Sequence, residues 1–393
     1  MIFDKLFQLM AEKQASDLYV TAGAPINIKI QGQTLPINQQ VMDPAMIRRM
    51  VAELVEPEQF ERFERDKEMN ISRGVKDLGN FRINVFWQRS SIGVVVRYIQ
   101  GDIPTLDSLG LPTILSELVM EKRGLLLVVG STGSGKSTTL ASMIDYRNRN
   151  RSGHILTVED PIEYLFRHRK SVVNQREVGI DTHSWQEALR NAMRQAPDCI
   201  LIGEIRDRET MQAALSYAQT GHLCLATLHA NNAYHALNRI VNFFPVESRS
   251  LLFLDLAVSL RTILSQRLVR KPDGKRIPAV EILLNTRHIT ELIERGELNE
   301  IKEAMEQSLA PGSRTFEQDL YRLYSEKAIT LDEALANADS PTNLSWIINN
   351  AQIGKDDGDA AVSHTPTIDF ERTEADGASF REFTLNLDDD LPR

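Results

Sequence analysis

The chain has 393 residues, which suggests two or three domains, and its apolar (42%) and charged (25%) fractions are those of an ordinary soluble globular protein. Seven of the nine net negative charges lie in residues 351–393, which contain eleven Asp or Glu and four Lys or Arg. The rest of the chain is therefore nearly neutral. This balance argues against a protein whose body grips a nucleic-acid backbone, and leaves room only for a local basic groove.

The two cysteines, Cys199 and Cys224, lie in apolar runs, which predicts buried structural thiols and no zinc site built from cysteines. Asp4 interrupts the apolar stretch that a signal peptide would need. The most apolar helical stretch, residues 251–260, carries a charged residue and is too short to span a bilayer. These observations predict a protein of the reducing cytoplasm.

Residues 1–100 predict a small α+β domain with a mostly antiparallel sheet. Apolar residues at helical spacing near the N-terminus predict an amphipathic helix. Residues 26–30 alternate strictly between apolar and polar, which indicates a strand. Residues 81–86 and 92–97 are expected to pair as strands across the turn at 88–91.

Residues 101–112 are rich in Gly, Pro and Asp and are expected to be a linker. From residue 113 to 345 the pattern changes to strands that alternate with helices. Four near-continuous apolar runs predict buried parallel strands with helices on both faces, the arrangement of an α/β domain. These runs are residues 125–129, 154–158, 199–202 and 223–227.

Residues 346–393 are expected to form a disordered acidic tail, because apolar residues become sparse there while Asp, Gly, Ser and Thr dominate. The tail still contains aromatic and aliphatic residues spaced among acids, and a short docking peptide is the alternative interpretation. They are Phe370, Phe380, Phe383, Leu385 and Leu387.

Residues 130–137 fit the phosphate-binding loop pattern G-x-x-x-x-G-K-[ST]. The loop follows the apolar strand at 125–129 and opens a helix, which is the context that the pattern requires. Lys136 would reach the β- and γ-phosphates, and Ser137 would bind Mg²⁺. The predicted phosphate-binding residues are Gly130, Ser131, Thr132, Gly133, Ser134, Gly135, Lys136, Ser137 and Thr138.

Three further polar stretches stand at the ends of predicted strands, where open α/β sheets bind ligands. Residues 159–163 contain three carboxylates, for which an acidic surface turn is the alternative. Glu204 follows an apolar strand like a Walker B acid, or else forms an ion pair with Arg206. His222 and His229 flank the last strand and could sense a γ-phosphate, or be ordinary satisfied polar groups.

In order and spacing, these stretches resemble the secretion ATPases of type II and type IV pilus systems, over roughly residues 1–345. Within that superfamily the chain resembles the retraction branch, PilT and PilU, because its N-terminal region is short and a tetracysteine insertion is missing. The resemblance implies a homo-hexameric ring with nucleotide between subunits. It also implies a PAS-like N-terminal domain before a RecA-like P-loop ATPase domain.

The resemblance also implies roles for single residues and two ligands, ATP and Mg²⁺. Glu163 matches the water-activating carboxylate of the family. Glu204 matches the Walker B acid that helps to hold Mg²⁺, directly or through water, and His222 and His229 belong to the histidine box. Arginines of the N-terminal domain complete the site in this family. Arg82 and Arg97 match them best, with Arg89 as a third candidate.

One helix separates the two members of the retraction branch. The primary motor carries a basic Ala-Ile-Arg-Asn-Leu-Ile-Arg-Glu helix, whereas residues 287–294 of this chain keep the apolar spacing and replace most of the basic residues with acids. This fits the accessory member. The predicted function is an ATP-hydrolysing hexamer that powers or assists type IV pilus retraction together with a primary retraction ATPase.

The resemblance places that motor in the cytoplasm at the inner-membrane base of the pilus. There it would contact an inner-membrane platform protein, touch the membrane only through its partners and bind no nucleic acid. Three alternatives stay open from the sequence. They are an extension or type II secretion ATPase, a regulatory subunit that binds ATP without hydrolysing it, and a nucleic-acid translocase, which the near-neutral body disfavours.

Overall fold

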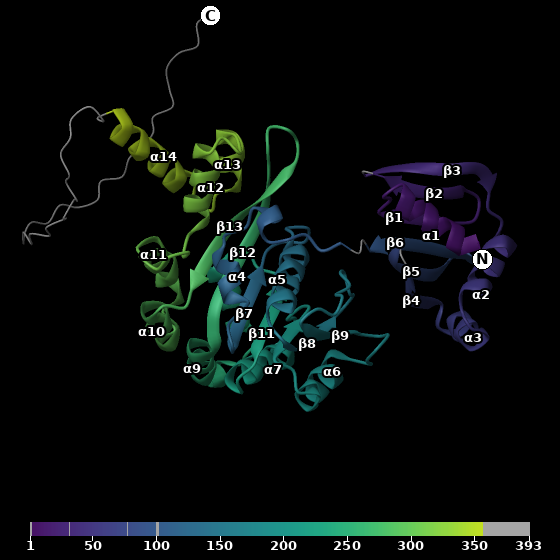
Figure 1. Ribbon diagram of the computed structural model, residues 1–393, viewed down its shortest axis with the longest axis horizontal. Helices are drawn as coiled ribbons and strands as arrows, with labels where there is room; N and C mark the ends of the chain where they lie inside the picture. The colour runs from purple at the N-terminus through teal and green to yellow at the C-terminus, as the bar shows by residue number, and fades with distance from the viewer. Residues whose placement is uncertain (1, 31, 77, 100–101, 357–393) are drawn as a thin grey trace, which may run out of the picture. The chain divides into compact units, whose positions relative to one another are not determined.

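The computed structural model describes residues 2–30, 32–76, 78–99 and 102–356 of the chain. These residues form two β-sheets, each with helices of its own (Figure 1). The first sheet is built from residues 17–99 and the second from residues 124–284. Within the described residues, every helix is too short or too polar to cross a lipid bilayer.

The first sheet has six strands, all paired antiparallel, in the order β3-β2-β1-β6-β5-β4. The strands are β1 (Asp17–Val20), β2 (Pro25–Ile30), β3 (Gln33–Val41), β4 (Glu68–Val75), β5 (Gly79–Gln88) and β6 (Ser91–Ile99). The helices of this part are α1 (Ile2–Glu12), α2 (Pro44–Leu54) and α3 (Pro57–Asp66). The predicted N-terminal helix and the predicted β5–β6 hairpin are confirmed.

Helix α1 covers one face of this sheet. Its Phe7 ring stacks on Phe81 of β5 with ring centroids 4.3 Å apart. Phe81, Ile83 and Val85 are all fully buried in the same apolar cluster. Because successive strand residues point to opposite faces, Arg82 lies on the other face of the sheet. The first sheet therefore has one apolar face and one polar face.

The second sheet has seven strands in the order β13-β12-β7-β11-β10-β8-β9. The strands are β7 (Gly124–Val129), β8 (Gly153–Glu159), β9 (Ser171–Glu177), β10 (Cys199–Ile202), β11 (Leu223–Leu228), β12 (Leu260–Arg270) and β13 (Arg276–Leu284). All neighbours pair in parallel except β12 and β13, which form an antiparallel pair at one edge. The predicted parallel strands are confirmed, and β13 is an antiparallel addition to them.

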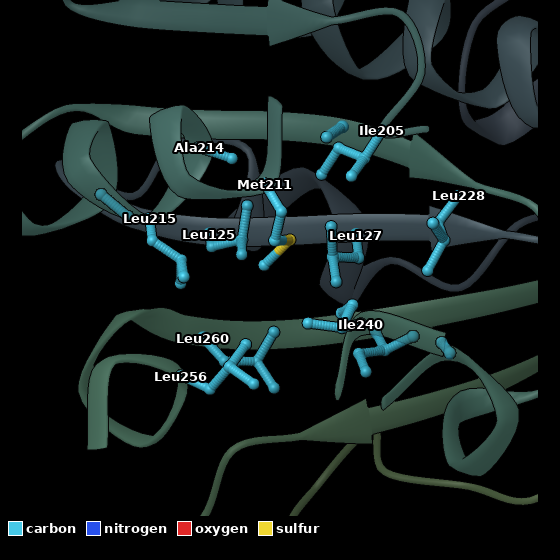
Figure 2. Packing of buried hydrophobic residues seen from close by; sticks show 14 of the residues in the cluster. Leu125, Leu127, Ile205, Met211, Ala214, Leu215, Leu228, Ile240, Leu256 and Leu260 are labelled. Carbon is cyan, nitrogen blue, oxygen red and sulfur yellow. The ribbon is translucent and has the colours of Figure 1, made fainter. Parts of the chain in front are cut away.

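Helices cover both faces of the second sheet, as its apolar strands predict. Leu125 and Leu127 of β7 belong to one buried cluster, which includes residues of α7 (Arg208–Gln219), α8 (Ala233–Asn242) and α9 (Arg249–Ser259) (Figure 2). Leu126 and Val128, the alternate residues of the same strand, belong to a second cluster that includes α5 (Lys136–Asn150). The two predicted structural thiols, Cys199 and Cys224, are buried in these layers.

The remaining helices complete these layers or pack at the β12–β13 edge, where α12 contacts β13 and α13 contacts β12. They are α4 (Ile114–Leu118), α6 (Trp185–Ala192), α10 (Arg287–Arg295), α11 (Ile301–Glu306), α12 (Phe316–Ser325) and α13 (Leu331–Asn337). Helix α14 (Pro341–Asp356) follows α13 in the chain. Short 3-10 helices are η1 (Asp107–Leu109), η2 (Met193–Gln195), η3 (Val246–Ser248) and η4 (Leu298–Glu300).

Two features differ from the expectation. The sequence does not predict β9, β12 or β13, because polar residues inside them hide the apolar pattern. Ser265 and Gln266 of β12, for example, are buried, and the Ser265 hydroxyl donates to Glu281 of β13 at 2.9 Å.

The expected start of the tail at residue 346 is also wrong. Helix α14 runs through that point to Asp356, because Leu344 and Ile348, four residues apart, are both buried. The remainder of the expected tail, residues 357–393, and the docking peptide considered within it lie outside the described residues.

Candidate active site

The carboxyl ends of β7, β8, β10 and β11 surround a cavity of about 230 Å³. The loop between β7 and α5 forms one wall of this cavity, and all nine predicted phosphate-binding residues lie in this loop and the first turn of α5. Gly130 and Gly135 have backbone φ angles of 155° and 90°, which residues other than glycine rarely adopt. The loop therefore has the strand, glycine turn and helix N-terminus that bind phosphate.

Lys136 carries the positive charge of this loop. Its side chain is only 8% exposed, and its Nζ donates hydrogen bonds to the carbonyls of Gly130 at 3.0 Å and Ser131 at 2.8 Å. Burial lowers the pKa of Lys136, while the nearby carboxylates of Glu204 and Glu163 act in the opposite direction. A cation held between two acids and the loop backbone is well placed to bind a polyphosphate.

Ser137 and Thr138 follow Lys136 at the start of α5. Ser137 lines the cavity, and Thr138 Oγ1 lies 2.8 Å from the hydroxyl of Tyr164. The Thr138–Tyr164 hydrogen bond ties the beginning of α5 to the acidic segment after β8. The phosphate loop and the acidic segment are thus held against each other by their own side chains.

The acidic segment 159–163 contains one buried and one exposed glutamate. Glu159, the last residue of β8, is 9% exposed and accepts hydrogen bonds from Thr157 at 2.6 Å and from Gln175 at 3.2 Å. Burial raises its pKa to about 7, in spite of these hydrogen bonds. Glu163 is exposed and lines the cavity that Lys136 also lines. The segment is therefore more than a solvated surface turn.

Gln175 of β9 is a site residue that the sequence reasoning missed. Its Nε2 donates to Glu159 and to the carbonyl of Tyr164 at 2.8 Å, and its Oε1 accepts from the backbone N–H of Phe166 at 2.9 Å. One amide therefore holds the segment that carries Glu163 from both sides. The sequence gives only a weak indication of β9, because the strand shows a short alternation of apolar and polar residues.

Glu204 follows β10 and is bound on both of its oxygens. Arg206 Nε lies 2.6 Å from Oε2, and His229 Nε2 lies 3.2 Å from Oε1. Arg206 also contacts Asp160 at 3.4 Å. Glu204 and His229 line the same cavity as Lys136. The sequence left two alternatives for Glu204, a place in the active site or an ion pair with Arg206. In the structure Glu204 has both.

The structure separates the two predicted histidines. His229 follows β11 at the edge of the sheet that bears the phosphate loop, because Leu228 of β11 pairs with Val129 of β7. His222 precedes β11, and its Nδ1 contacts Thr220 at 3.1 Å. Six strand residues at about 3.3 Å each put the backbones of the two histidines about 20 Å apart. Within one chain, a shared role of both histidines at one phosphate is therefore wrong.

The candidate arginines lie on the first sheet. Arg82 of β5 and Arg97 of β6 are directly opposite each other on its polar face, and Arg97 Nε donates to Asp17 at 2.9 Å. Arg89 sits in the turn after β5, seven residues from Arg82, or about 20 Å along an extended chain. Arg82 and Arg97 thus form a pair, and Arg89 does not belong to it.

Comparison with known proteins identifies the family of this chain. The family model described as "Type II/IV secretion system protein" matches residues 1–296. The type IV pilus ATPase PilU of Pseudomonas aeruginosa is 46% identical over 97% of this chain and 100% of that protein. The chain belongs to the PilT/PilU family of type IV pilus ATPases. The resemblance inferred from its sequence is thereby confirmed.

Other members of the PilT/PilU family match over most of their length. PilT of Pseudomonas aeruginosa, a type IV pilus retraction ATPase, is 37% identical over 86% of this chain and 99% of that protein. A crystal structure of the pilus retraction motor PilT with bound ADP matches with a TM-score of 0.81 and 41% identity. That match covers 87% of this chain and 98% of the PilT chain. The family fold therefore extends over both sheets.

Proposed function

We propose that the chain is an ATP-hydrolysing subunit of a hexameric motor that assists type IV pilus retraction together with a primary retraction ATPase. One observation carries this proposal: Lys136, Ser137, Glu163, Glu204 and His229 come from four strand ends and line one cavity. This set contains a cation for phosphate, two carboxylates and a polar sensor, which are the groups that triphosphate hydrolysis needs. The similarity to PilU and PilT supplies the pilus context.

The donor atoms of the cavity fit Mg²⁺. The described residues contain no group of three or more His, Cys, Asp or Glu side chains arranged to hold a metal ion. Mg²⁺ at nucleotide sites needs no such group, because phosphate and water supply most of its ligands. Ser137 would bind the ion directly, and Glu204 would bind it through water, since Arg206 and His229 occupy its oxygens. Bound Mg²⁺ would neutralise charge on the β- and γ-phosphates.

The other catalytic tasks are performed by side chains of the chain. Lys136 binds the β- and γ-phosphates and offsets the charge that develops during cleavage. Glu163, exposed to the cavity, orients and deprotonates the attacking water. Glu204 passes a change at the γ-phosphate to His229 through their 3.2 Å contact. Arg82 and Arg97 complete the site in the assembled ring, where cations meet charge that grows in the transition state.

At the level of the whole protein, we infer a PAS-like N-terminal domain (residues 1–100), a linker (101–112) and a RecA-like ATPase domain from residue 113. The motor works in the cytoplasm at the inner-membrane base of the pilus and reaches the membrane through a platform protein. The two arginines belong to the first sheet and the phosphate loop to the second. Nucleotide turnover would therefore move one domain against another and transmit force to that partner.

Steady-state ATPase measurements test the enzymatic part. Lys136→Ala and Glu163→Gln should each lower kcat by about 10² or more, as expected for loss of a phosphate-binding cation or a general base. Glu187→Gln, an exposed acid on α6, serves as the matched control and should keep wild-type turnover. Wild-type turnover no higher than that of Lys136→Ala would instead support the regulatory subunit.

Cell assays test the pilus part. Deletion of the gene in a host that keeps its primary retraction ATPase should reduce retraction force and leave the cells piliated. Re-expression of the wild type, but not of Glu163→Gln, should restore the force. Bald cells after deletion would contradict a role in retraction and indicate an extension motor.

A further inference from the structure

Gln266 of β12 contacts the phosphate loop with both ends of its side-chain amide. Its Nε2 donates to the carbonyl of Ser134 at 2.8 Å, and its Oε1 accepts from the hydroxyl of Thr139 at 2.8 Å. The side chain is 3% exposed, and both hydrogen bonds are buried. Strand β12 lies beside β7, the strand that leads into the loop, with Ser265 opposite Val129. Gln266 is thus placed directly against the loop without lining the cavity.

The glycines at the two ends of the loop show how closely Gln266 approaches. A Cβ atom at position 130 would lie 2.5 Å from the backbone carbonyl oxygen of Gln266, and a Cβ atom at position 135 would lie 2.7 Å from its Nε2. Both distances are shorter than real Cβ contacts, so neither glycine can carry a side chain unless Gln266 moves. The two outer glycines of the phosphate-binding pattern are therefore packed against this one residue.

We propose that Gln266 is a positioning residue of the nucleotide site, which holds the phosphate loop in the shape that binds phosphate. In a trans peptide the C=O and N–H groups point in opposite directions. When Gln266 binds the carbonyl of Ser134, it directs the N–H of Gly135 away from β12. The same amide holds Thr139 in the first turn of α5. Lys136 lies between these two anchors, so its backbone position depends on both.

Arg267, the next residue on the same strand, contacts a different part of the molecule. Its guanidinium lies 3.9 Å from the ring centroid of Phe316 on α12, and it donates to the carbonyl of Asn231 at 3.2 Å. Adjacent strand residues point to opposite sides, so the contacts of Gln266 can be removed without those of Arg267. The proposed role of Gln266 can therefore be tested apart from the stability of the strand.

ADP affinity is the decisive measurement, made by calorimetry on the full-length protein. Gln266→Met keeps the length of the side chain but removes both hydrogen bonds, and Thr139→Val removes one of them. Kd for ADP should rise about tenfold in Gln266→Met and about threefold in Thr139→Val, since each buried bond contributes roughly a factor of three to ten. Thr139→Ser keeps the hydroxyl and should restore wild-type affinity.

Thr262→Val provides the matched control. Thr262 lies on the same strand, and its buried hydroxyl donates to the carbonyl of Leu283 at 2.8 Å, away from the phosphate loop. This variant should lower the thermal unfolding temperature as Thr139→Val does, while its Kd for ADP stays at the wild-type value. In ATPase assays, Gln266→Met should raise KM and also lower kcat, because the loop binds the ground-state phosphates and positions Lys136, which acts in the transition state.

Three outcomes would overturn the role of Gln266: wild-type ADP affinity in a folded Gln266→Met protein, failure of Thr139→Ser to restore affinity, or an equal loss of affinity in Thr262→Val. The inference rests on the nucleotide site of the proposed function, but not on hydrolysis. A wild-type protein that binds ADP and does not turn over ATP would refute the motor and leave this test intact. A wild-type protein that binds no ADP would refute the site itself.

Discussion

Glu281 of β13 leads to a specific prediction about stability. Its carboxylate is 4% exposed, and its Oε1 accepts hydrogen bonds from the backbone N–H of Ala233 at 2.7 Å and from Ser265 at 2.9 Å. Burial raises its pKa from about 4.5 to about 7, and the nearby Asp339 and Glu317 add to the increase. The ionised form is therefore costly in the folded protein, and we expect Glu281→Gln to stabilise the fold at alkaline pH.

The size and sign of this stability change follow from the linkage between proton binding and folding. Between pH 4.5 and 7 the unfolded chain releases the proton of Glu281 while the folded chain keeps it, so the free energy of unfolding falls as pH rises through this window. Above pH 7 the loss levels off at about 3 kcal/mol, since each pKa unit corresponds to roughly 1.4 kcal/mol. Glutamine is neutral throughout. Because both hydrogen bonds use one oxygen, the amide oxygen of glutamine can accept both of them.

Urea unfolding between pH 4.5 and 8.5, followed by circular dichroism, measures this effect. Glu281→Gln should be about 3 kcal/mol more stable than the wild type at pH 8, and the difference should shrink toward zero near pH 4.5. Glu247→Gln, which changes an exposed acid of η3, should show no comparable pH-dependent gain. A Glu281→Gln protein that is equally or less stable at pH 8 would refute the reasoning.

Three further predictions concern catalysis and are read from steady-state ATPase assays. Gln175→Ala should lower kcat about tenfold with ADP affinity nearly unchanged, because the amide holds the Glu163 segment and not the phosphate loop; an unchanged kcat would contradict this. His229→Ala should reduce kcat about tenfold or more while His222→Ala does not, and equal losses would show that the contact with Glu204 is irrelevant. In the assembled ring, Arg97→Ala should reduce kcat by roughly 10³, as loss of an arginine finger does. Arg89→Ala should have little effect on kcat. A larger loss of kcat in Arg89→Ala than in Arg97→Ala would exchange the roles of the two arginines.

Local sequence patterns predict much of the candidate active site. The apolar strand before the phosphate loop and the loop's glycine and lysine spacing are contiguous in the sequence, so they predict phosphate binding without any tertiary contact. Glu163, Glu204 and His229 follow recognisable strand ends, and parallel strands bring such ends to one edge. For this reason their meeting at one cavity could be expected before the structure was known.

The sequence by itself determined the phosphate loop, the parallel strands around it and the family, because each depends on residues that are near one another in the chain. Only the tertiary structure decided the roles of polar residues inside strands, such as Gln175 and Gln266. Their hydrogen-bond partners lie up to 132 residues away, and a buried amide has no sequence pattern of its own. The tertiary structure also separated His222 from His229, since the direction of β11, and not the distance in the chain, determines which histidine stands beside the phosphate loop.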